Sequence, residues 1–310
     1  MVRDDTIYPR NQPILSVIIP HYNDLEALDR CLNLLCHQTC DRTLFEIIVV
    51  DNNSAVGLAA VQAVVGERAT VITALEQGAA MARNAGVAAA RGDIFAFIDS
   101  DCCPAPDWIE NGWRAIANAK TPIVGGCVRT IPAQPDAPNP VEAFELVFAF
   151  KNEVYIKKVG FSVTANLFVQ RAVFEHVGGF RQGLAEDKDW GLRAVEMGYA
   201  ITYQPDVIVD HPARSNWSAL AKKWKRLTHE EYLLRRANHL GTINWFTYMG
   251  LILISPLLHS IQVLQFQGLR PMVKLNVIAV LFRIRVYRCV EAWRMWSGVL
   301  SVSSASHSKI

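Results

Sequence analysis

Three short polar segments each follow a run of apolar residues that is typical of a buried strand. They are Pro20-His21-Tyr22-Asn23 after LSVII, Asp51-Asn52-Asn53 after IIVV, and Asp99-Ser100-Asp101 after IFAFI. In a parallel α/β sheet, ligands bind just beyond the carboxyl ends of the strands. We therefore expect these segments to meet at one edge of a sheet and to form a binding site there.

Asp99 and Asp101 are separated by one residue, so both carboxylates can face one hard cation. Mg²⁺ and Mn²⁺ prefer oxygen ligands and commonly bind through one or two carboxylates together with phosphate oxygens. Such an ion neutralises charge on a departing diphosphate. An isolated D-x-D pattern is weak evidence, because about one is expected by chance in a chain of this length. The alternative is a turn with Asp caps, and the position after IFAFI favours the metal site.

The elements that must position these groups alternate along the first 210 residues, which indicates βαβ units around a mostly parallel sheet. The sequence predicts strands at residues 15–20, 47–50, 69–73, 94–98 and 123–128. It predicts helices at residues 25–35, 56–65 and 78–90, and one that begins near Pro106. Further along, it predicts helices at 141–150 and 187–198, a strand at 164–169, and strand pieces at 201–209 broken at Pro205. The expected fold class is α/β.

Charge and hydropathy divide the chain into three parts. We expect an N-terminal tail at residues 1–13, an α/β domain at 14–216, and a basic, apolar helical extension at 217–310. Residues 1–210 hold 17 Lys and Arg against 26 Asp and Glu, whereas residues 211–310 hold 14 against 3. An acidic body with a basic tail suggests an anionic partner for the tail, either nucleic acid or a membrane surface.

The extension combines basic stretches with a long apolar one, because no Lys, Arg, Asp or Glu occurs from Ala237 to Leu269. Residues 243–266 are long enough to cross a bilayer, although Pro256, His259 and two glutamines interrupt them. A single crossing from the cytosol would place the arginines after it outside, against the positive-inside rule. We therefore expect the extension to lie on the membrane or form a hairpin. A soluble or dimer-forming helical subdomain is the alternative, and no nucleic-acid fold signature accompanies the charges.

The seven cysteines are odd in number and form no CxxC pair, which favours reduced thiols in the cytosol. The N-terminal residues are polar and lack the apolar stretch of a secretory signal. The expected location is the cytoplasm, at the cytoplasmic face of the cell membrane.

Six segments in order resemble glycosyltransferase family 2. They are LSVIIPHYND, IIVVDNNS, MARNAGVAAARGDIFAFIDSD, NLFVQRAVFEHVGGF, EDKDWGLRAVEMGY and VDHPARS, and together they span about residues 14–230. The resemblance implies the GT-A fold, a Rossmann-like transferase fold, and a nucleoside-diphosphate sugar as donor. It also implies inversion of the anomeric centre and a Mn²⁺ or Mg²⁺ ion.

The resemblance also implies roles for individual residues. Donor-side roles in nucleotide binding fall to Pro20, Tyr22, Asn23, Asp51, Arg83 and Asp99. Arg83 is expected to meet the diphosphate or an acidic partner, with a solvated helix face as the alternative. The metal would be held by Asp99, Asp101 and His211. On the acceptor side, Asn166 and Trp190 are candidates, although a loop support and an apolar helix position explain them as well.

Glu186 and Asp187 resemble the acidic pair of the family, in which the second carboxylate is the catalytic base. Inversion is a direct displacement, so a carboxylate across the site must take the proton of the attacking hydroxyl. General-base help is typically worth about 10²–10⁴ in rate. Asp187 opens a predicted helix, whose dipole favours the ionised form. The alternative is that these acids are ordinary first-turn residues and N-caps.

One departure from the family is informative. Processive members carry a Q-x-x-R-W motif after the acidic pair, and the nearest segment here, Lys222-Lys223-Trp224-Lys225-Arg226, does not match it. We therefore expect an enzyme that adds a single sugar onto a glycan or a lipid-linked acceptor. The expected donor is a UDP-sugar, with GDP- and dTDP-sugars as the alternatives. A catalytically idle scaffold that binds nucleotide-sugar or glycan is the alternative. A nucleotidyltransferase would need a Gly-rich basic loop after the first strand, and HYND is not one.

Overall fold

The computed structural model describes residues 13–118, 121–183, 185–237 and 242–298. The chain divides into two compact units. The sheet unit comprises the chain up to Arg129, Phe150–Gln182 and Glu186–His211. The helical unit comprises Thr130–Ala149, Gly183–Ala185 and the chain from Pro212 onward. The segment Thr130–Ala149, which the sequence places in the first domain, therefore packs with the helical unit.

The sheet unit is built on one eight-stranded mixed sheet with the strand order β3-β2-β1-β4-β7-β6-β8-β5. Its parallel half contains β1 (Leu15–His21), β2 (Phe45–Asp51), β3 (Thr70–Thr73) and β4 (Ile94–Phe97). Its other half contains β5 (Cys103–Pro104), β6 (Ile123–Ile131), β7 (Leu167–Gln170) and β8 (Ile201–Pro212). There β7 runs antiparallel to β4 and β6, and β5 runs antiparallel to β8.

The predicted mostly parallel sheet is thus correct for the first half and wrong for the second. Apolar runs of this kind indicate that a strand is buried, but they do not encode its direction. The predicted break at Pro205 is also wrong, since β8 continues through it. Pro205 is exposed at that point, where a strand tolerates the missing N–H.

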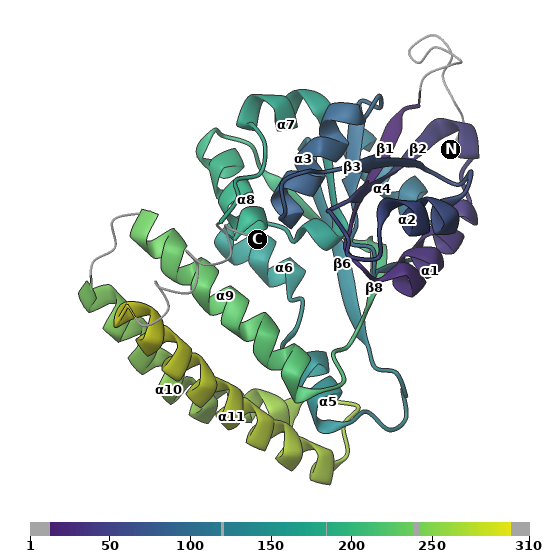
Figure 1. Cartoon of the computed structure of the whole chain (residues 1–310). Helices are drawn as coiled ribbons and strands as arrows, with labels where there is room; N and C mark the ends of the chain where they lie inside the picture. Colours follow the sequence, from purple (N-terminus) through teal and green to yellow (C-terminus); the bar gives the residue numbers. More distant parts are fainter. Residues whose placement is uncertain (1–12, 119–120, 184, 238–241, 299–310) are drawn as a thin grey trace. The chain divides into compact units, whose positions relative to one another are not determined.

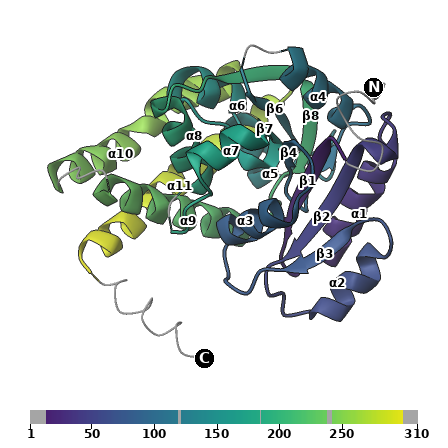
Figure 2. The same cartoon turned by 90° about the horizontal axis from the view of Figure 1, so that it is seen from above.

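Helices cover both faces of the sheet (Figures 1 and 2). One face packs against α1 (Leu25–Cys36), α2 (Leu58–Val65) and α4 (Trp108–Asn118). The opposite face packs against α3 (Ala79–Ala89), α7 (Arg171–Val177) and α8 (Glu186–Glu196). Alternate residues of one strand serve the two cores, because successive side chains point to opposite faces. On β1, Val17 belongs to the first core and Ile18 to the second.

Short helical segments complete the sheet unit. These are the 3-10 turns η1 (Arg42–Leu44) and η3 (Thr164–Asn166), the single-turn helix α6 (Asn152–Val154), and the π-helical turn η2 (Tyr155–Val159) that continues α6.

The helical unit contains α5 (Pro140–Phe148), α9 (Trp217–Ala237), α10 (Thr242–Gln265) and α11 (Pro271–Trp296), of which the last three lie side by side (Figure 1). Its core includes Phe144 of α5, Leu220 of α9, Val263 of α10 and Leu281 of α11. Among the described residues, α10 is the one helix long and apolar enough to cross a membrane, over Asn244–Gln265. Only 17% of its most apolar window is buried, so most of that stretch is not covered by the part of the chain that the structure describes.

Candidate active site

The loops that follow β1 and β2 hold each other in place. The two strands pair so that His21 lies opposite Asp51, and the Asn52 N–H donates to the His21 carbonyl at 2.8 Å. Asn23 has a φ of 65°, in the left-handed region that Asn tolerates better than most residues. Its N–H donates to Ser54 Oγ at 2.9 Å, and its Oδ1 accepts from the Ala55 N–H at 2.7 Å. The predicted convergence of the first two polar segments is therefore present.

Buried polar atoms in these loops lack partners among the described residues. His21 is 1% exposed and neither ring nitrogen has a hydrogen bond; Asp51 is 2% exposed and its Oδ1 has none. Burial lowers the pKa of His21, although the charges of Asp51 and Asp24 act against it. Buried polar groups are usually hydrogen-bonded, so these atoms fit a polar ligand. Pro20 is half-buried beside them, and the Tyr22 ring is 52% exposed.

His21 lies in the first polar segment, but the sequence assigns it no role of its own. A signal was present, because His21 stands between Pro20 and Tyr22 in the first polar segment. A lone histidine does not reveal from its sequence position that it is buried without a partner.

Arg83 joins two acidic segments that are far apart in the chain. It projects from α3, is 4% exposed, and its Nη2 contacts Asp99 Oδ1 at 2.6 Å while its Nη1 contacts Glu186 Oε1 at 3.0 Å. Burial alone would lower the pKa of Arg83, but the charges of Asp99 and Glu186 outweigh burial and raise it. Of the two roles expected for Arg83, the structure supports the acidic partner, and the buried Nε remains without a hydrogen bond.

Asp187 belongs to the same charged group. It is the second residue of α8, it is half-buried, and its Oδ1 accepts the Lys188 N–H at 2.8 Å. Its charge adds to those that raise the pKa of Arg83. The same charge adds to the effect of burial, which raises the pKa of Tyr155. The structure therefore gathers Arg83, Asp99, Glu186 and Asp187 in one region of the sheet unit.

A second cluster could hold a metal ion. One ligand atom each from Asp101, Cys102 and His211 lies within 4.8 Å of the others, and Asp101 Oδ2 lies 3.4 Å from His211 Nε2. A carboxylate and an imidazole suit Mn²⁺, whereas the buried Cys102 thiol is a softer ligand than Mn²⁺ or Mg²⁺ prefers. The donor set of Asp101 and His211 fits a divalent ion. Asp99 contacts Arg83 through Oδ1 at 2.6 Å, and its role as a third ligand stays a prediction.

Asn166 and Trp190, the acceptor-side candidates, occupy structural positions instead. Asn166 is fully buried: its Oδ1 accepts from Trp108 Nε1 and its Nδ2 donates to the Val207 and Cys127 carbonyls, each at 2.9 Å. Trp190 is 1% exposed, donates to the Gly178 carbonyl at 2.9 Å, and stacks on Phe174. Both side chains have all their polar groups engaged inside the protein, so we do not assign them to an acceptor.

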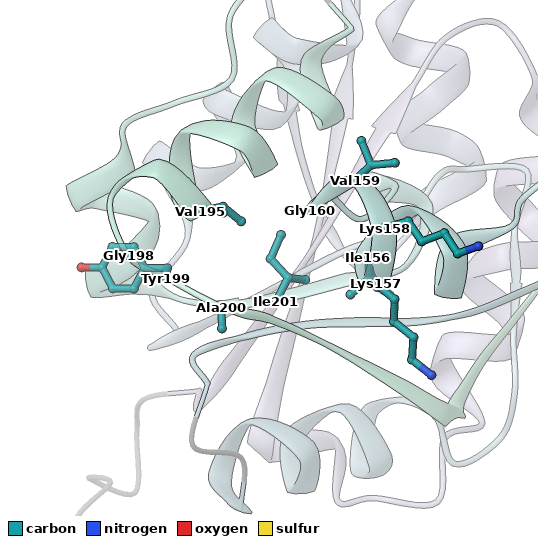
Figure 3. Close-up of a pocket in the computed structure, with 10 residues that line it drawn as sticks. All are labelled: Ile156, Lys157, Lys158, Val159, Gly160, Val195, Gly198, Tyr199, Ala200 and Ile201. Atoms are coloured by element: carbon teal, nitrogen blue, oxygen red, sulfur yellow. The ribbon is translucent and has the colours of Figure 1, made fainter.

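A separate pocket of about 420 Å³ lies between η2 and the turn from α8 to β8 (Figure 3). Its lining is mainly apolar or small, with Lys157 and Lys158 as the charged members. None of the acidic residues described above lines this pocket, and Lys157 is already paired with Glu153 at 2.6 Å.

Comparisons with known proteins point to one family. Residues 16–178 match the family described as Glycosyl transferase family 2. The chain is 35% identical to glycosyltransferase AglE of Haloferax volcanii over 222 residues, which cover 69% of this chain and 71% of AglE. It is 28% identical to validoxylamine A glucosyltransferase of Streptomyces hygroscopicus subsp. jinggangensis over 61% of this chain and 51% of that protein. The chain thus spans about half of that second relative.

One similar solved structure is the mannosyltransferase PcManGT from Pyrobaculum calidifontis in complex with GDP-Man and Mn²⁺. The superposition has a TM-score of 0.59 and covers 92% of this chain and 88% of that one, at 19% sequence identity. At this identity the likeness shows the fold alone, which is the GT-A fold predicted from the sequence.

Proposed function

Since this chain belongs to glycosyl transferase family 2, we propose that it transfers single sugars with inversion from a nucleoside-diphosphate sugar to an acceptor hydroxyl. The family assignment makes the chain a glycosyltransferase that uses a nucleotide-sugar donor. The proposal adds the stereochemistry, the residues that do the chemistry, the metal and the class of acceptor.

The observation that carries the proposal is the placement of Arg83 between Asp99 and Glu186. Asp99 begins the polar segment after β4, and Glu186 begins α8, yet one buried guanidinium contacts both at 2.6 and 3.0 Å. Arg83 thereby holds the edge of the sheet proposed to bind the nucleotide next to α8, the helix that carries the proposed base. A displacement needs the donor on one side of the site and the attacking hydroxyl on the other, and the pairing of these two elements supports that arrangement.

On the donor side, we assign the nucleotide to the loops after β1 and β2. Asp51 and His21 offer buried polar atoms without partners, and Tyr22 offers an exposed ring. Asn23 holds the two loops together. We expect UDP-sugars to be the preferred donors, with GDP- and dTDP-sugars as the alternatives to test.

Asp101 and His211 would hold a Mn²⁺ or Mg²⁺ ion, which supplies positive charge to the leaving diphosphate. PcManGT carries Mn²⁺ with its GDP-Man, which supports the use of a divalent ion here.

Asp187 acts as the general base in this proposal. The acceptor oxygen forms a bond to the anomeric carbon while the bond from that carbon to the diphosphate breaks, and the hydroxyl proton passes to the Asp187 carboxylate. The position of Asp187 in the first turn of α8 favours its charged form. Glu186 positions this turn through its ion pair with Arg83.

The helical unit is proposed to attach the enzyme to the cytoplasmic face of a membrane, which suits a glycan or lipid-linked acceptor. Exposed leucines and isoleucines crowd α10, for example Leu257 at 65% and Leu258 at 69%. The last hundred residues carry 14 Lys and Arg against 3 Asp and Glu, so they would be attracted to anionic headgroups. We propose residues 14–216 as the catalytic part and residues 217–310 as the attachment.

Nucleotide titration tests the donor and metal side. We expect UDP or GDP to bind in the presence of Mn²⁺ and to lose that metal-dependent binding in Asp101→Ala. The exposed Asp107→Ala, which removes a carboxylate in the next loop, is the control and should bind as the unaltered chain does. Equal binding with and without Mn²⁺ would contradict the metal assignment.

Transfer assays test the base, after a mass-spectrometric screen of UDP-, GDP- and dTDP-sugars has identified the donor. Asp187→Asn should bind nucleotide normally and lose about 10²–10⁴ in turnover. Glu196→Gln, at the exposed far end of α8, should keep full turnover. Unchanged turnover in Asp187→Asn would remove this residue as the base, and a chain with no transfer to any donor would favour the alternative of a binding scaffold.

A further inference from the structure

Two arginines are buried in the helical unit without a carboxylate partner. Arg285 and Arg288 lie on α11 and are each 8% exposed. Arg288 donates from Nε to Thr228 Oγ1 at 3.3 Å and from Nη2 to the Tyr248 hydroxyl at 2.7 Å. Arg285 Nη2 lies 3.4 Å from His259 Nδ1, and its Nε has no hydrogen bond. Among the described residues, neither guanidinium group therefore contacts a carboxylate.

The acids of the C-terminal hundred residues are engaged with other cations. Glu230 pairs with Arg226, Glu231 with Arg235, and Glu291 with Lys225 and Arg294. Residues 238–241 and 299–310 contain no Asp or Glu. The tail of this chain thus supplies no further carboxylate side chain for Arg285 and Arg288.

A half-buried tryptophan lies beside the arginine pair. Trp224 contacts both, with the guanidinium carbons of Arg288 and Arg285 at 4.3 and 5.4 Å from its ring centre. Among the described residues, Trp224 Nε1 is buried without a hydrogen bond. The arginines and this indole form a cluster rich in hydrogen-bond donors, and no described carboxylate is paired with either guanidinium group.

Isolated buried charges are strongly unfavourable unless an opposite charge accompanies them. Burial, helped by the charge of Arg288, lowers the pKa of Arg285 to about 10. Guanidinium groups match the oxygens of a phosphate in pairs, better than an ammonium does. A phosphate group is therefore the anion that fits two adjacent guanidinium forks with neutral donors around them.

The neighbouring surface indicates where such a phosphate comes from. Tyr248 and His259, which contact the arginines, lie on α10. The same helix exposes Leu253, Leu257 and Leu264, each more than half exposed, and helical spacing places them on the side away from Tyr248 and His259. A helix that presents phosphate-binding partners on one side and bare aliphatic side chains on the other suits a ligand with an anionic head and an apolar body.

We propose that Arg285 and Arg288 form a binding site for the phosphate group of an anionic membrane lipid. The identification of the ligand as a lipid rests on the proposed membrane attachment. The site in turn specifies which headgroup the attached chain recognises. General attraction to negative charge needs only exposed lysines and arginines, whereas this site needs two buried ones.

Flotation of the full chain with vesicles tests the proposal. The probes are phosphatidylcholine vesicles, alone or with phosphatidic acid or phosphatidylserine. We expect Arg285→Gln and Arg288→Gln each to weaken binding to phosphatidic acid by about tenfold or more. Arg283→Gln is the matched control, because it removes the same charge from an exposed position on the same helix. An equal loss in all three variants, or no loss in the first two, would overturn the proposal.

The unfolding temperature in detergent, measured with and without lipid, provides a second test. It distinguishes a ligand-binding role of Arg285 from a role in the fold alone. Arg285→Met should unfold at the same or a higher temperature without ligand, since replacing a buried unpaired charge with an apolar side chain is often neutral or stabilising. It should also lose the stabilisation that dioctanoyl phosphatidic acid gives the unaltered chain. A large loss of stability in Arg285→Met without ligand would contradict the site, because it would mean that the arginine serves the fold.

The same measurement separates the sources of phosphate. Inorganic phosphate should stabilise the chain much less than dioctanoyl phosphatidic acid at equal concentration. Equal effects would overturn the lipid as the ligand. Nucleotide binding with Mn²⁺, measured on the same variants, should stay unchanged, so failure at this site and failure of the proposed enzyme are distinguishable.

Discussion

In the sheet unit the buried Arg83 lies between two carboxylates, whereas in the helical unit the buried Arg285 and Arg288 contact no carboxylate of the described residues. Arg83 is thus neutralised by the fold itself, and its contacts fix the relative positions of Asp99 and Glu186. The pair in the helical unit is not neutralised among the described residues. The difference teaches that a buried arginine can serve two purposes. Arg83 holds two acidic segments of the protein together, whereas Arg285 and Arg288 are proposed to bind a ligand.

The helical unit also contains a buried charge that is paired with opposite charges. The contrast is therefore between paired and unpaired buried charges, and not between the two units. Glu145 is 1% exposed and contacts Arg214 at 3.0 Å and Lys223 at 2.7 Å. Its pKa is lowered: burial would raise it, but the charges of Lys223 and Arg214 outweigh burial. The comparison can therefore be tested by removing one charge from each cluster.

The largest effect is expected for Arg83→Met, which leaves Asp99 and Glu186 facing each other without a cation. We expect the free energy of unfolding to fall by about 3 kcal/mol, the low end for a broken buried pair because the Asp99 side chain is 33% exposed. Urea denaturation gives this value, and metal-dependent nucleotide binding should be lost with it.

Arg91→Met is the control for this change. Arg91 pairs with Glu46 at 2.9 Å, but its side chain is 63% exposed, so its loss should cost no more than about 1 kcal/mol. If both variants lose the same stability, the Arg83 cluster is not the internal support that the comparison requires.

A smaller effect is expected for Glu145→Gln, which leaves the half-buried Lys223 beside a neutral amide. We expect a loss of about 2 kcal/mol, since Arg214 and Lys223 retain some solvent, at 24% and 13% exposure. Glu153→Gln, in the exposed pair with Lys157, should change stability by less than about 0.5 kcal/mol. Equal values would remove the distinction between compensated and surface charges in this chain.

The sequence predicted much of this arrangement because strand ends carry a strong local signal. The apolar runs before Asn23, Asp51 and Asp99 place these residues after three adjacent parallel strands, as β1, β2 and β4 show. The family resemblance then linked Glu186 and Asp187 to the same site, and the structure gathers them with Arg83. The sequence position of a residue was sufficient to predict its place in the site wherever the direction of the backbone alone decides where the residue lies.

What the sequence could not predict depends on side-chain direction and on packing between distant elements. Trp190 is four residues after Glu186, so it lies on nearly the same side of α8, but only the packing of α8 on Phe174 shows that its ring is in the core. Asn166 is a polar residue whose three partners come from remote segments. The isolation of Arg285 and Arg288 likewise emerges only when α9, α10 and α11 pack together.

The smallest effect is expected for His21. It tests whether a buried ring without a hydrogen bond resists taking up charge at the β1–β2 edge of the sheet, whereas the helical unit keeps two buried charges without a carboxylate. Burial holds the pKa of His21 below the 6.5 of an exposed histidine, so the folded chain favours the neutral ring. Above pH 6.5 the ring is neutral in both states and the fold keeps its full stability. As the pH falls below 6.5, the unfolded chain takes up a proton that the folded chain resists, and the free energy of unfolding declines. Between pH 7.5 and 5, urea denaturation should show a decline larger by about 1 kcal/mol in the unaltered chain than in His21→Gln. Parallel curves would mean that the ring takes up its proton as readily in the folded as in the unfolded chain, because Asp51 and Asp24 offset the effect of burial.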